Sequence, residues 1–273
     1  MAAIKRFRLP TEIPLEEYPS PEEFIKEAME CVEEAEKRSL VLRVMGGMAI
    51  YMHSRQYEEL WRKLGRLGKR VFTDIDFASY GKFRDRVMKF LRERGYMVHQ
   101  RAMFGMAKER LIFFGERIPM VEVFFDRLRM NHVIEFKNRL EVDRPTVPLA
   151  ELLLQKIQIV HMNEKDIKDA VVLIRAHEIG ESDEEMINAK HIAKIMANDW
   201  GFYYTSTTNL KKISESLDKY EVLSDEDKEI VRQRINKLLT YIENEPKSFR
   251  WKMRARVGTK KKWYEDVEEW ITF

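Results

Sequence analysis

Hydrophobic positions recur with a helical period in the first long segment of the chain. Within "SPEEFIKEAMECVEEAEKR" (20–38), one helical face would carry the apolar residues Phe24, Ile25, Ala28, Val32 and Ala35. Ser20 at the N-cap, Pro21 at the next position and Glu23 at the third form a capping-box pattern. The pattern predicts an amphipathic helix that packs on a larger body.

Shorter apolar runs follow, and their length and composition predict strands. They occupy 39–45, 71–78, 96–100, 110–115, 119–126 and 132–136. "MAIYMHS" (48–54) and "KFRDRVMKFLRERG" (82–95) have helical spacing, and Gly95 is a C-terminal stop signal. "GER" (115–117) predicts a hairpin turn between two of the strands.

After Pro148 the pattern becomes almost entirely helical. The clearest segments are 149–162, 165–178 and 224–245. We therefore predict an α+β fold in two domains. Residues 1–145 would form a mixed β-sheet flanked by helices, with the helix at 20–38 packed on it, and residues 146–273 would form a helical C-terminal domain with a basic tail.

Composition adds three constraints. The chain has 273 residues, of which 44% are hydrophobic and 35% are charged, and its net charge is +3. Cys31 is the single cysteine, which excludes an intramolecular disulfide and a Cys-rich zinc site. The first 14 residues lack the apolar core of a secretory signal, and no apolar run reaches the roughly 18 residues of a membrane helix. We expect a cytoplasmic protein without a membrane partner.

Two aspartates one residue apart are the first candidate for chemistry. On a strand, Asp74 and Asp76 would point to the same face, with Cα atoms about 6.6 Å apart. Carboxylates at that spacing can converge on Mg²⁺, which takes one or two protein carboxylates and fills its other positions with water and phosphate oxygens. The alternative is that they solvate a strand end or pair with lysines.

Gly46 and Gly47 come earlier, between a predicted strand and a predicted helix. The first N–H groups of a helix have no partner within the helix, and glycines leave them accessible to a phosphate. The alternative is a tight turn. Glu122 is a third acid, within an apolar strand where a buried charge needs a partner or a metal. Asp126 is its rival, unless Asp126 begins the next turn.

Gly46-Gly47, then Asp74-Ile75-Asp76, then an acid in a later apolar strand, resembles the nucleotidyltransferase superfamily with the DNA polymerase β-like fold. The helical segment 147–174 looks like that of the AbiEii-type branch, which includes toxin nucleotidyltransferases. There a helix with a lysine, here Lys156, precedes a basic stretch with two acids, here Lys165-Asp166 and Asp169. The similarity covers roughly residues 39 to 178.

The resemblance implies transfer of a nucleoside monophosphate from an NTP to a hydroxyl group. Two Mg²⁺ ions would be held by Asp74, Asp76 and Glu122, which would also be the catalytic residues. The NTP-binding residues would be Gly46, Gly47, Thr73 and Lys156. In relatives the second glycine is often serine and the third acid is more often aspartate. The 26 residues between Gly47 and Asp74 are also a longer gap than many members have. Alternatively, Lys156 could be a surface lysine whose aliphatic stem lies along apolar neighbours while its charged end reaches water. Asp166 and Asp169 could instead orient lysines or cap a helix.

Two basic segments are candidate acceptor surfaces. "KSFRWKMRARVGTKKK" (247–262) has eight basic residues, no acid, and the aromatic residues Phe249 and Trp251, a combination that suits phosphate contacts and base stacking. Its alternative is a solvated tail anchored by the aromatics. The second cluster precedes the aspartates and contains Arg62, Lys63, Arg66, Lys69 and Arg70. Both clusters favour RNA over a small-molecule acceptor, and the resemblance to toxin relatives makes tRNA the candidate.

Other functions remain open at this point. The acceptor could be a small molecule, as for antibiotic nucleotidyltransferases. The fold could also be catalytically silent and bind nucleic acid or a protein, and the toxin-like branch makes a cognate antitoxin a candidate partner. A nuclease or sugar transferase with a DxD motif explains Gly46, Gly47 and Lys156 less well.

Overall fold

A computed structural model describes residues 8–66, 68–98 and 109–267. The chain forms two compact units. The first lies within segments 1–49, 67–128 and 135–147, and the second within 50–66, 129–134 and 148–273. The last passage between units, at 147/148, falls beside the boundary expected near residue 145, but two short segments of the N-terminal half belong to the second unit.

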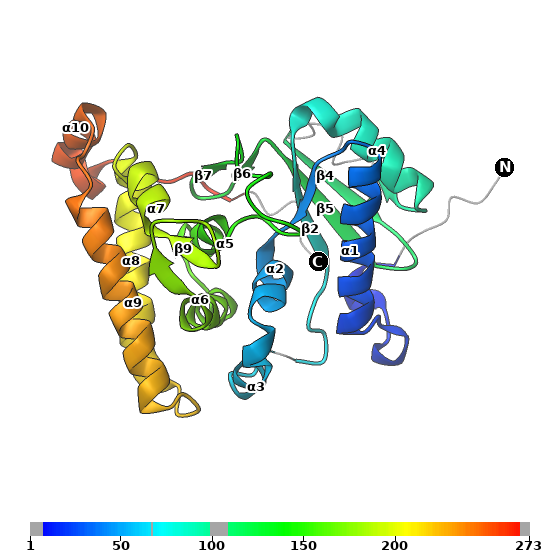
Figure 1. The fold of residues 1–273 in the computed structure, drawn as a ribbon, viewed down its shortest axis with the longest axis horizontal. Helices are drawn as coiled ribbons and strands as arrows, with labels where there is room; N and C mark the ends of the chain where they lie inside the picture. Colours follow the sequence, from blue (N-terminus) through cyan, green and yellow to red (C-terminus); the bar gives the residue numbers. More distant parts are fainter. Residues whose placement is uncertain (1–7, 67, 99–108, 268–273) are drawn as a thin grey trace. The chain divides into compact units, whose positions relative to one another are not determined.

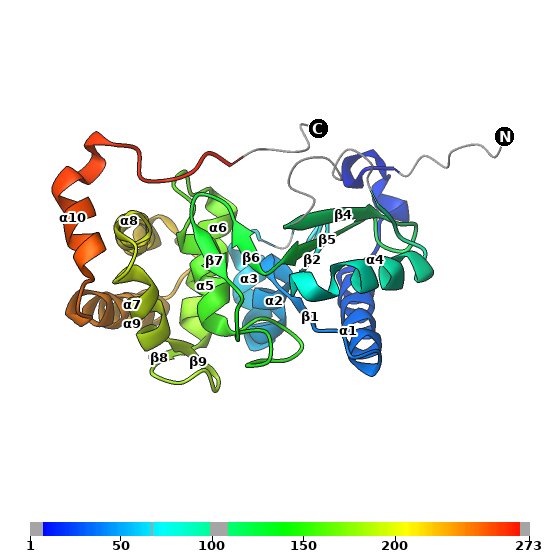
Figure 2. The same cartoon turned by 90° about the horizontal axis from the view of Figure 1, so that it is seen from above.

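Within its described residues, the first unit contains one five-stranded sheet and two complete α-helices. Its elements are α1 (Pro21–Lys37), β1 (Leu42–Val44), β2 (Ile75–Ser79), α4 (Arg84–Glu93), β3 (Met97–Val98), β4 (Arg110–Phe114) and β5 (Met120–Phe125). The strand order is β1-β2-β5-β4-β3. β2 and β5 run parallel, and the other neighbouring pairs are antiparallel. Figure 2 shows α1 and α4 on the same side of this sheet. The predicted α+β class with a mixed sheet is confirmed.

The start of α1 follows the predicted capping box. The Ser20 side chain accepts a hydrogen bond from the Glu23 N–H, and the Glu23 carboxylate accepts one from the Ser20 N–H at 2.7 Å. Phe24, Ala28 and Val32 are buried, as their spacing predicts. Glu27, a charged residue on the same face, is also buried, and the sequence pattern did not indicate this.

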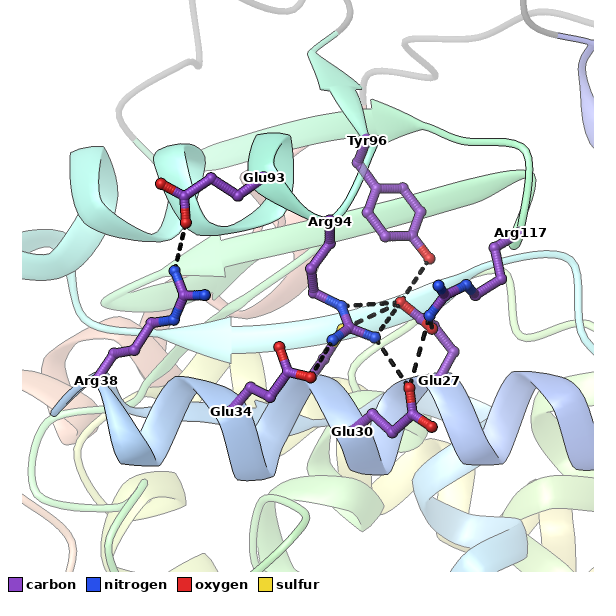
Figure 3. A network of polar contacts seen from close by, with 9 residues as sticks. Glu27, Glu30, Glu34, Arg38, Glu93, Arg94, Tyr96 and Arg117 are labelled. Carbon is purple, nitrogen blue, oxygen red and sulfur yellow. Dashed lines mark hydrogen bonds and ion pairs between the residues drawn. The ribbon is translucent and has the colours of Figure 1, made fainter.

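Glu27 is the centre of a polar network that attaches α1 to the rest of the first unit (Figure 3). Its carboxylate accepts hydrogen bonds from Arg94 at 2.9 Å, Arg117 at 2.7 Å, Tyr96 at 3.0 Å and the Cys31 thiol at 3.5 Å. A buried carboxylate is tolerated only when it is compensated in this way. The network therefore fixes α1 against the end of α4 and the turn between β4 and β5.

The second unit is mostly helical. Its helices are α3 (Glu58–Lys63), α5 (Leu149–Ile157), α6 (Glu164–Ala176), α7 (Ala189–Met196), α8 (Trp200–Ser216), α9 (Asp225–Asn244) and α10 (Phe249–Val257). α9 packs against α6, α7 and α8 (Figure 1). This unit also contains two short parallel strands that the sequence pattern did not predict, β8 (Glu178–Gly180) and β9 (Met186–Asn188). None of the helices in the described ranges has the length and apolarity to cross a bilayer.

Some predicted boundaries moved. The strand expected from Val71 begins only at Ile75, so Asp74 precedes β2. The helix expected from Met48, α2 (Gly46–His53), begins at Gly46 itself. The predicted hairpin is confirmed, because β4 and β5 pair across the turn that contains 115–117. β7 (Val133–Glu135) lies within the run at 132–136 and pairs with β6 (Arg127–Arg129) in a separate sheet. His99 and Gln100, the end of the strand predicted at 96–100, lie outside the described residues.

Candidate active site

The parallel pairing of β2 with β5 determines where two of the three acids lie. Asp76 is the register partner of Glu122. Directly paired residues point to the same face of a sheet, so the two carboxylates lie on one face. Their neighbours Ile75 and Val121 also pair and are fully buried on the opposite face. The apolar residues on either side therefore fix the direction of both acids.

Asp74 completes the group of acids from a position just outside the strand. It is half-buried. Its negative charge contributes to raising the pKa of Glu122, which requires the two carboxylates to be near one another. The first unit thus brings Asp74, Asp76 and Glu122 together, and we refer to them as the acid cluster.

Glu122 has an ion-pair partner that the sequence analysis missed. Arg110 donates two hydrogen bonds to Glu122 Oε2, from Nε at 3.0 Å and from Nη2 at 2.6 Å. The hairpin between β4 and β5 pairs Arg110 with Phe124, so Glu122 is its diagonal neighbour. The sequence did contain a signal for this pair. Arg110 is a basic residue at the start of a predicted strand, and that strand forms the predicted hairpin with the strand of Glu122.

Burial controls the protonation of Glu122. Removal from water raises the pKa of its carboxyl group, the Arg110 guanidinium opposes this, and the charge of Asp74 adds to it, so that the pKa reaches about 7. Glu122 can therefore both lose and accept a proton near neutral pH, as a general base does.

Gly46 lies directly against the acid cluster. Its φ of +70° favours glycine, and a Cβ atom there would be 2.7 Å from Asp76 Oδ2. The preceding Met45 N–H donates to the Asp76 carbonyl at 2.9 Å. The glycine pair, with Gly47 as the second residue of α2, thus places the start of that helix beside Asp76.

Asp126 has a different environment from Glu122. It follows β5 with a φ of +63°, and its carboxylate accepts a hydrogen bond from the Gly81 N–H at 2.9 Å. Its own N–H donates to the Ser79 carbonyl. Asp126 is therefore a turn residue, and Glu122 is the acid beside Asp76. Thr73, the remaining predicted NTP-binding residue of this unit, is exposed in the segment that leads to Asp74.

Lys156 belongs to the second unit, where it has acidic partners. Its Nζ lies 2.9 Å from Asp169 Oδ2 and 3.3 Å from Asp166 Oδ1. Arg66 also pairs with Asp169, at 2.6 Å. This geometry matches the interpretation that Asp166 and Asp169 orient a lysine.

Both members of the central pair remain charged despite burial. Burial opposes the charge on Lys156, but Asp169 and Asp166 outweigh it and raise its pKa above the usual value. Burial likewise disfavours the ionised Asp169, but Lys156 and Arg66 together lower its pKa. The cluster is therefore electrically compensated within the second unit.

The basic cluster that precedes the aspartates is largely occupied by internal contacts. Arg62 pairs with Glu58 at 2.9 Å and Lys63 with Glu59 at 2.8 Å. Arg66 is bound to Asp169, as described, and Arg70 donates to the Ile13 carbonyl at 2.6 Å. Its charge is thus less available to a nucleic acid than the sequence indicates.

The C-terminal basic segment divides into structural and exposed residues. Lys247 donates to backbone carbonyls at the end of α9, and Arg254 lies 4.7 Å from the centre of the Trp200 ring. Trp251 packs edge-on against Tyr203. Lys262 is exposed and pairs with Asp266. We call the other exposed basic residues, with Phe249, the α10 basic surface: Phe249, Arg250, Lys252, Arg256, Lys260 and Lys261. Phe249 is 80% exposed.

The acid cluster offers only oxygen donors, which suit a hard cation such as Mg²⁺. Across the described ranges, no three or more His, Cys, Asp or Glu side chains lie close enough together to hold a metal ion by themselves. Both hydrogen bonds from Arg110 go to Oε2 of Glu122, so that Oε1 can still ligate. The donor set thus fits an ion whose coordination is completed by water and triphosphate oxygens.

Comparison with known proteins does not assign a family. No protein-family model matches the chain, and no curated protein matches it.

Proposed function

We propose that this protein is an Mg²⁺-dependent nucleotidyltransferase that transfers a nucleoside monophosphate from an NTP to a hydroxyl group. One observation carries the proposal: Glu122 lies opposite Asp76 on the sheet, with Asp74 nearby and the Gly46 Cα against the Asp76 carboxylate. Carboxylates on one face of a sheet, beside a helix that starts with two glycines, can take part in holding a cation whose remaining ligands are water and triphosphate oxygens.

Each residue has a definite task in this reaction. Asp74 and Asp76 would hold Mg²⁺, and the backbone at Gly46 and Gly47 would hold phosphate oxygens. When bound, Mg²⁺ supplies charge stabilisation for the attacking and leaving oxygens. Glu122, whose pKa is about 7, accepts the proton of the acceptor hydroxyl. The hydroxyl oxygen then forms a bond to the α-phosphorus, and the bond from that phosphorus to the pyrophosphate oxygen breaks.

The resemblance alone gives Lys156 a role with the phosphates, and the acceptor is also part of the proposal. The α10 basic surface combines exposed cations with an exposed aromatic ring, which favours a polynucleotide acceptor such as tRNA. A cognate antitoxin and a small-molecule acceptor rest on the resemblance only. A catalytically silent protein that binds nucleic acid or another protein is a second candidate, because the ion pair with Arg110 engages the carboxylate of Glu122.

The test is incubation of the purified protein with each α-³²P-labelled NTP, Mg²⁺ and total tRNA. Asp74→Asn and Asp76→Asn variants are the controls, because each keeps the size of the side chain and removes its charge. Label that appears on tRNA with the wild type and disappears with both variants supports the proposal and identifies the nucleotide.

Other results have equally specific meanings. Transfer to a small hydroxyl compound but not to tRNA would retain the enzyme and reject the polynucleotide acceptor. Binding of NTP and Mg²⁺ without transfer would mean that the acceptor is another compound, and absence of both binding and transfer would favour the silent protein. Transfer that persists in Asp76→Asn would contradict the assignment of the acid cluster.

A further inference from the structure

Asp74 is held differently from the other two acids. Asp76 and Glu122 lie within paired strands, but β2 begins at Ile75, so the ladder of the sheet does not include Asp74. A metal ligand must be held within a fraction of an ångström by its supporting contacts. The position of Asp74 therefore also depends on what holds the segment that leads to β2.

Residues that precede α1 contact the chain immediately before Asp74. The Tyr18 hydroxyl donates a hydrogen bond to the Phe72 carbonyl at 3.1 Å, two residues before Asp74. Arg70 donates to the Ile13 carbonyl at 2.6 Å, and its guanidinium carbon lies 5.0 Å from the centre of the Tyr18 ring. The segment 13–18 thus contacts the segment 70–72 through both backbone and side chains.

Packing reinforces these hydrogen bonds. Phe72 is buried, and its ring centre lies 6.0 Å from that of Phe24 in α1. Phe24 in turn packs against Tyr18 at 6.1 Å. The polar network around Glu27 holds α1 in place (Figure 3). Because Phe24 belongs to α1, the same network also fixes the position of these aromatic contacts.

Tyr18 is also close to the acid itself. Burial, the negative charge of Asp74 and the opposing charge of Arg70 together raise the pKa of Tyr18 to about 12. The phenol therefore keeps its proton at neutral pH and remains a hydrogen-bond donor to Phe72.

We infer that Tyr18 is a positioning residue for metal binding: through its hydrogen bond to the Phe72 carbonyl, it fixes the segment that carries Asp74. This inference rests on the proposed function. The inference adds a requirement to that function: the segment 13–18, outside the sheet, influences the affinity of the acid cluster for the cation.

The test compares Tyr18→Phe with Tyr80→Phe. Each change removes one tyrosine hydroxyl from the first unit, and the two residues flank opposite ends of β2. Tyr80 donates to Glu141 instead. Binding of Mn²⁺, in the presence of a non-hydrolysable NTP, is measured by electron paramagnetic resonance, and Mg²⁺ dependence is measured in the transfer assay.

We expect Tyr18→Phe to bind Mn²⁺ roughly 10-fold more weakly, within the range seen when a group that supports a metal ligand is removed. It should need more Mg²⁺ for half-maximal transfer and should recover kcat at saturating Mg²⁺, whereas Tyr80→Phe should match the wild type. A general loss of folding would not produce that recovery.

Two results would overturn the inference in distinguishable ways. If the wild type transfers nucleotide and Tyr18→Phe has the same Mn²⁺ affinity and Mg²⁺ dependence, the inference is wrong and the proposed function stands. If the wild type binds no Mn²⁺ with the nucleotide and transfers no label, both are wrong.

Discussion

Asp76 and Glu122 are separated by 45 residues in the sequence and are direct neighbours across the parallel pairing of β2 with β5. Their proximity depends on register, because a slip of one residue would turn Glu122 toward the opposite, apolar face. The buried residues beside them hold that register.

The stability of the metal-free protein should depend on pH through Glu122. Its folded-state pKa of about 7 lies above the value of 4.5 for a free side chain, so its contribution is full below pH 4.5 and is lost as the pH rises through 7. Relative to Glu122→Gln, the wild type should lose up to about 3 kcal/mol of unfolding free energy between pH 5 and 8. Urea unfolding of both proteins at the two pH values measures this. A constant difference would contradict it.

Replacement of Gly46 should be more harmful than replacement of another glycine with positive φ. Gly95→Ala meets no atom within 4 Å and should cost about 1–2 kcal/mol for its backbone conformation alone. Gly46→Ala adds a Cβ atom 2.7 Å from Asp76 Oδ2, and a total of about 3 kcal/mol is expected, together with loss of transfer. Thermal unfolding and the transfer assay compare the two; equal effects would exclude the steric contact.

Asp169 should be essential for the second unit to fold stably. Asp169→Ala leaves Lys156 and Arg66 buried without their shared carboxylate, which should cost about 3–5 kcal/mol. Asp166→Asn is the matched control, because it removes the charge from the longer, 3.3 Å contact and should cost about 1 kcal/mol. Chemical unfolding distinguishes the two. If Asp169→Ala left the free energy of unfolding unchanged, the stability of the second unit would not depend on the pairing of Asp169 with Lys156.

Charge reversal is a better test of the α10 basic surface than truncation. The Trp263 ring N–H donates to Thr205 at 3.0 Å, so removal of everything after residue 246 would also remove a structural contact of α8. The Arg250→Glu/Lys252→Glu variant should reduce tRNA affinity at least about 10-fold and flatten its salt dependence. Lys211→Glu/Lys237→Glu, on exposed positions of α8 and α9, should change it less. If both double variants lost the same tRNA affinity, binding would depend on the net charge of the protein and not on the α10 basic surface.

Cys31 should be unreactive in the folded protein. It is fully buried, and burial, followed by the nearby charge of Glu27, raises the pKa of its thiol far above its usual range. A thiol-specific reagent should modify it only after unfolding, because the thiolate is the reactive form. Rapid modification of the native protein would contradict the packing of α1.

Periodic patterns predicted much of the fold. The capping box of α1, the hairpin between β4 and β5 and the helices after Pro148 depend on neighbouring residues, which a sequence displays directly. The same holds for the strand, glycine pair and helix around Gly46.

What the sequence did not predict depends on contacts between distant segments. The pairing of Arg110 with Glu122 requires the hairpin register, and the burial of Glu27 requires arginines from two other elements. The choice between Glu122 and Asp126 required the register of β2 with β5 and the turn conformation of Asp126. Basic residues gave the least reliable prediction, since composition does not reveal that Arg66 has an internal acidic partner.

The passage of the chain back and forth between the two units has a practical consequence. The chain leaves one unit for the other after residues 49, 66, 128, 134 and 147. No single cleavage can therefore release either unit intact. A fragment that ends near residue 147 would still carry 50–66 and 129–134, which belong to the second unit, but would lack residues 148–273 of that unit. Neither unit corresponds to one continuous segment of the sequence, so an expression boundary placed at any single internal position divides at least one of them.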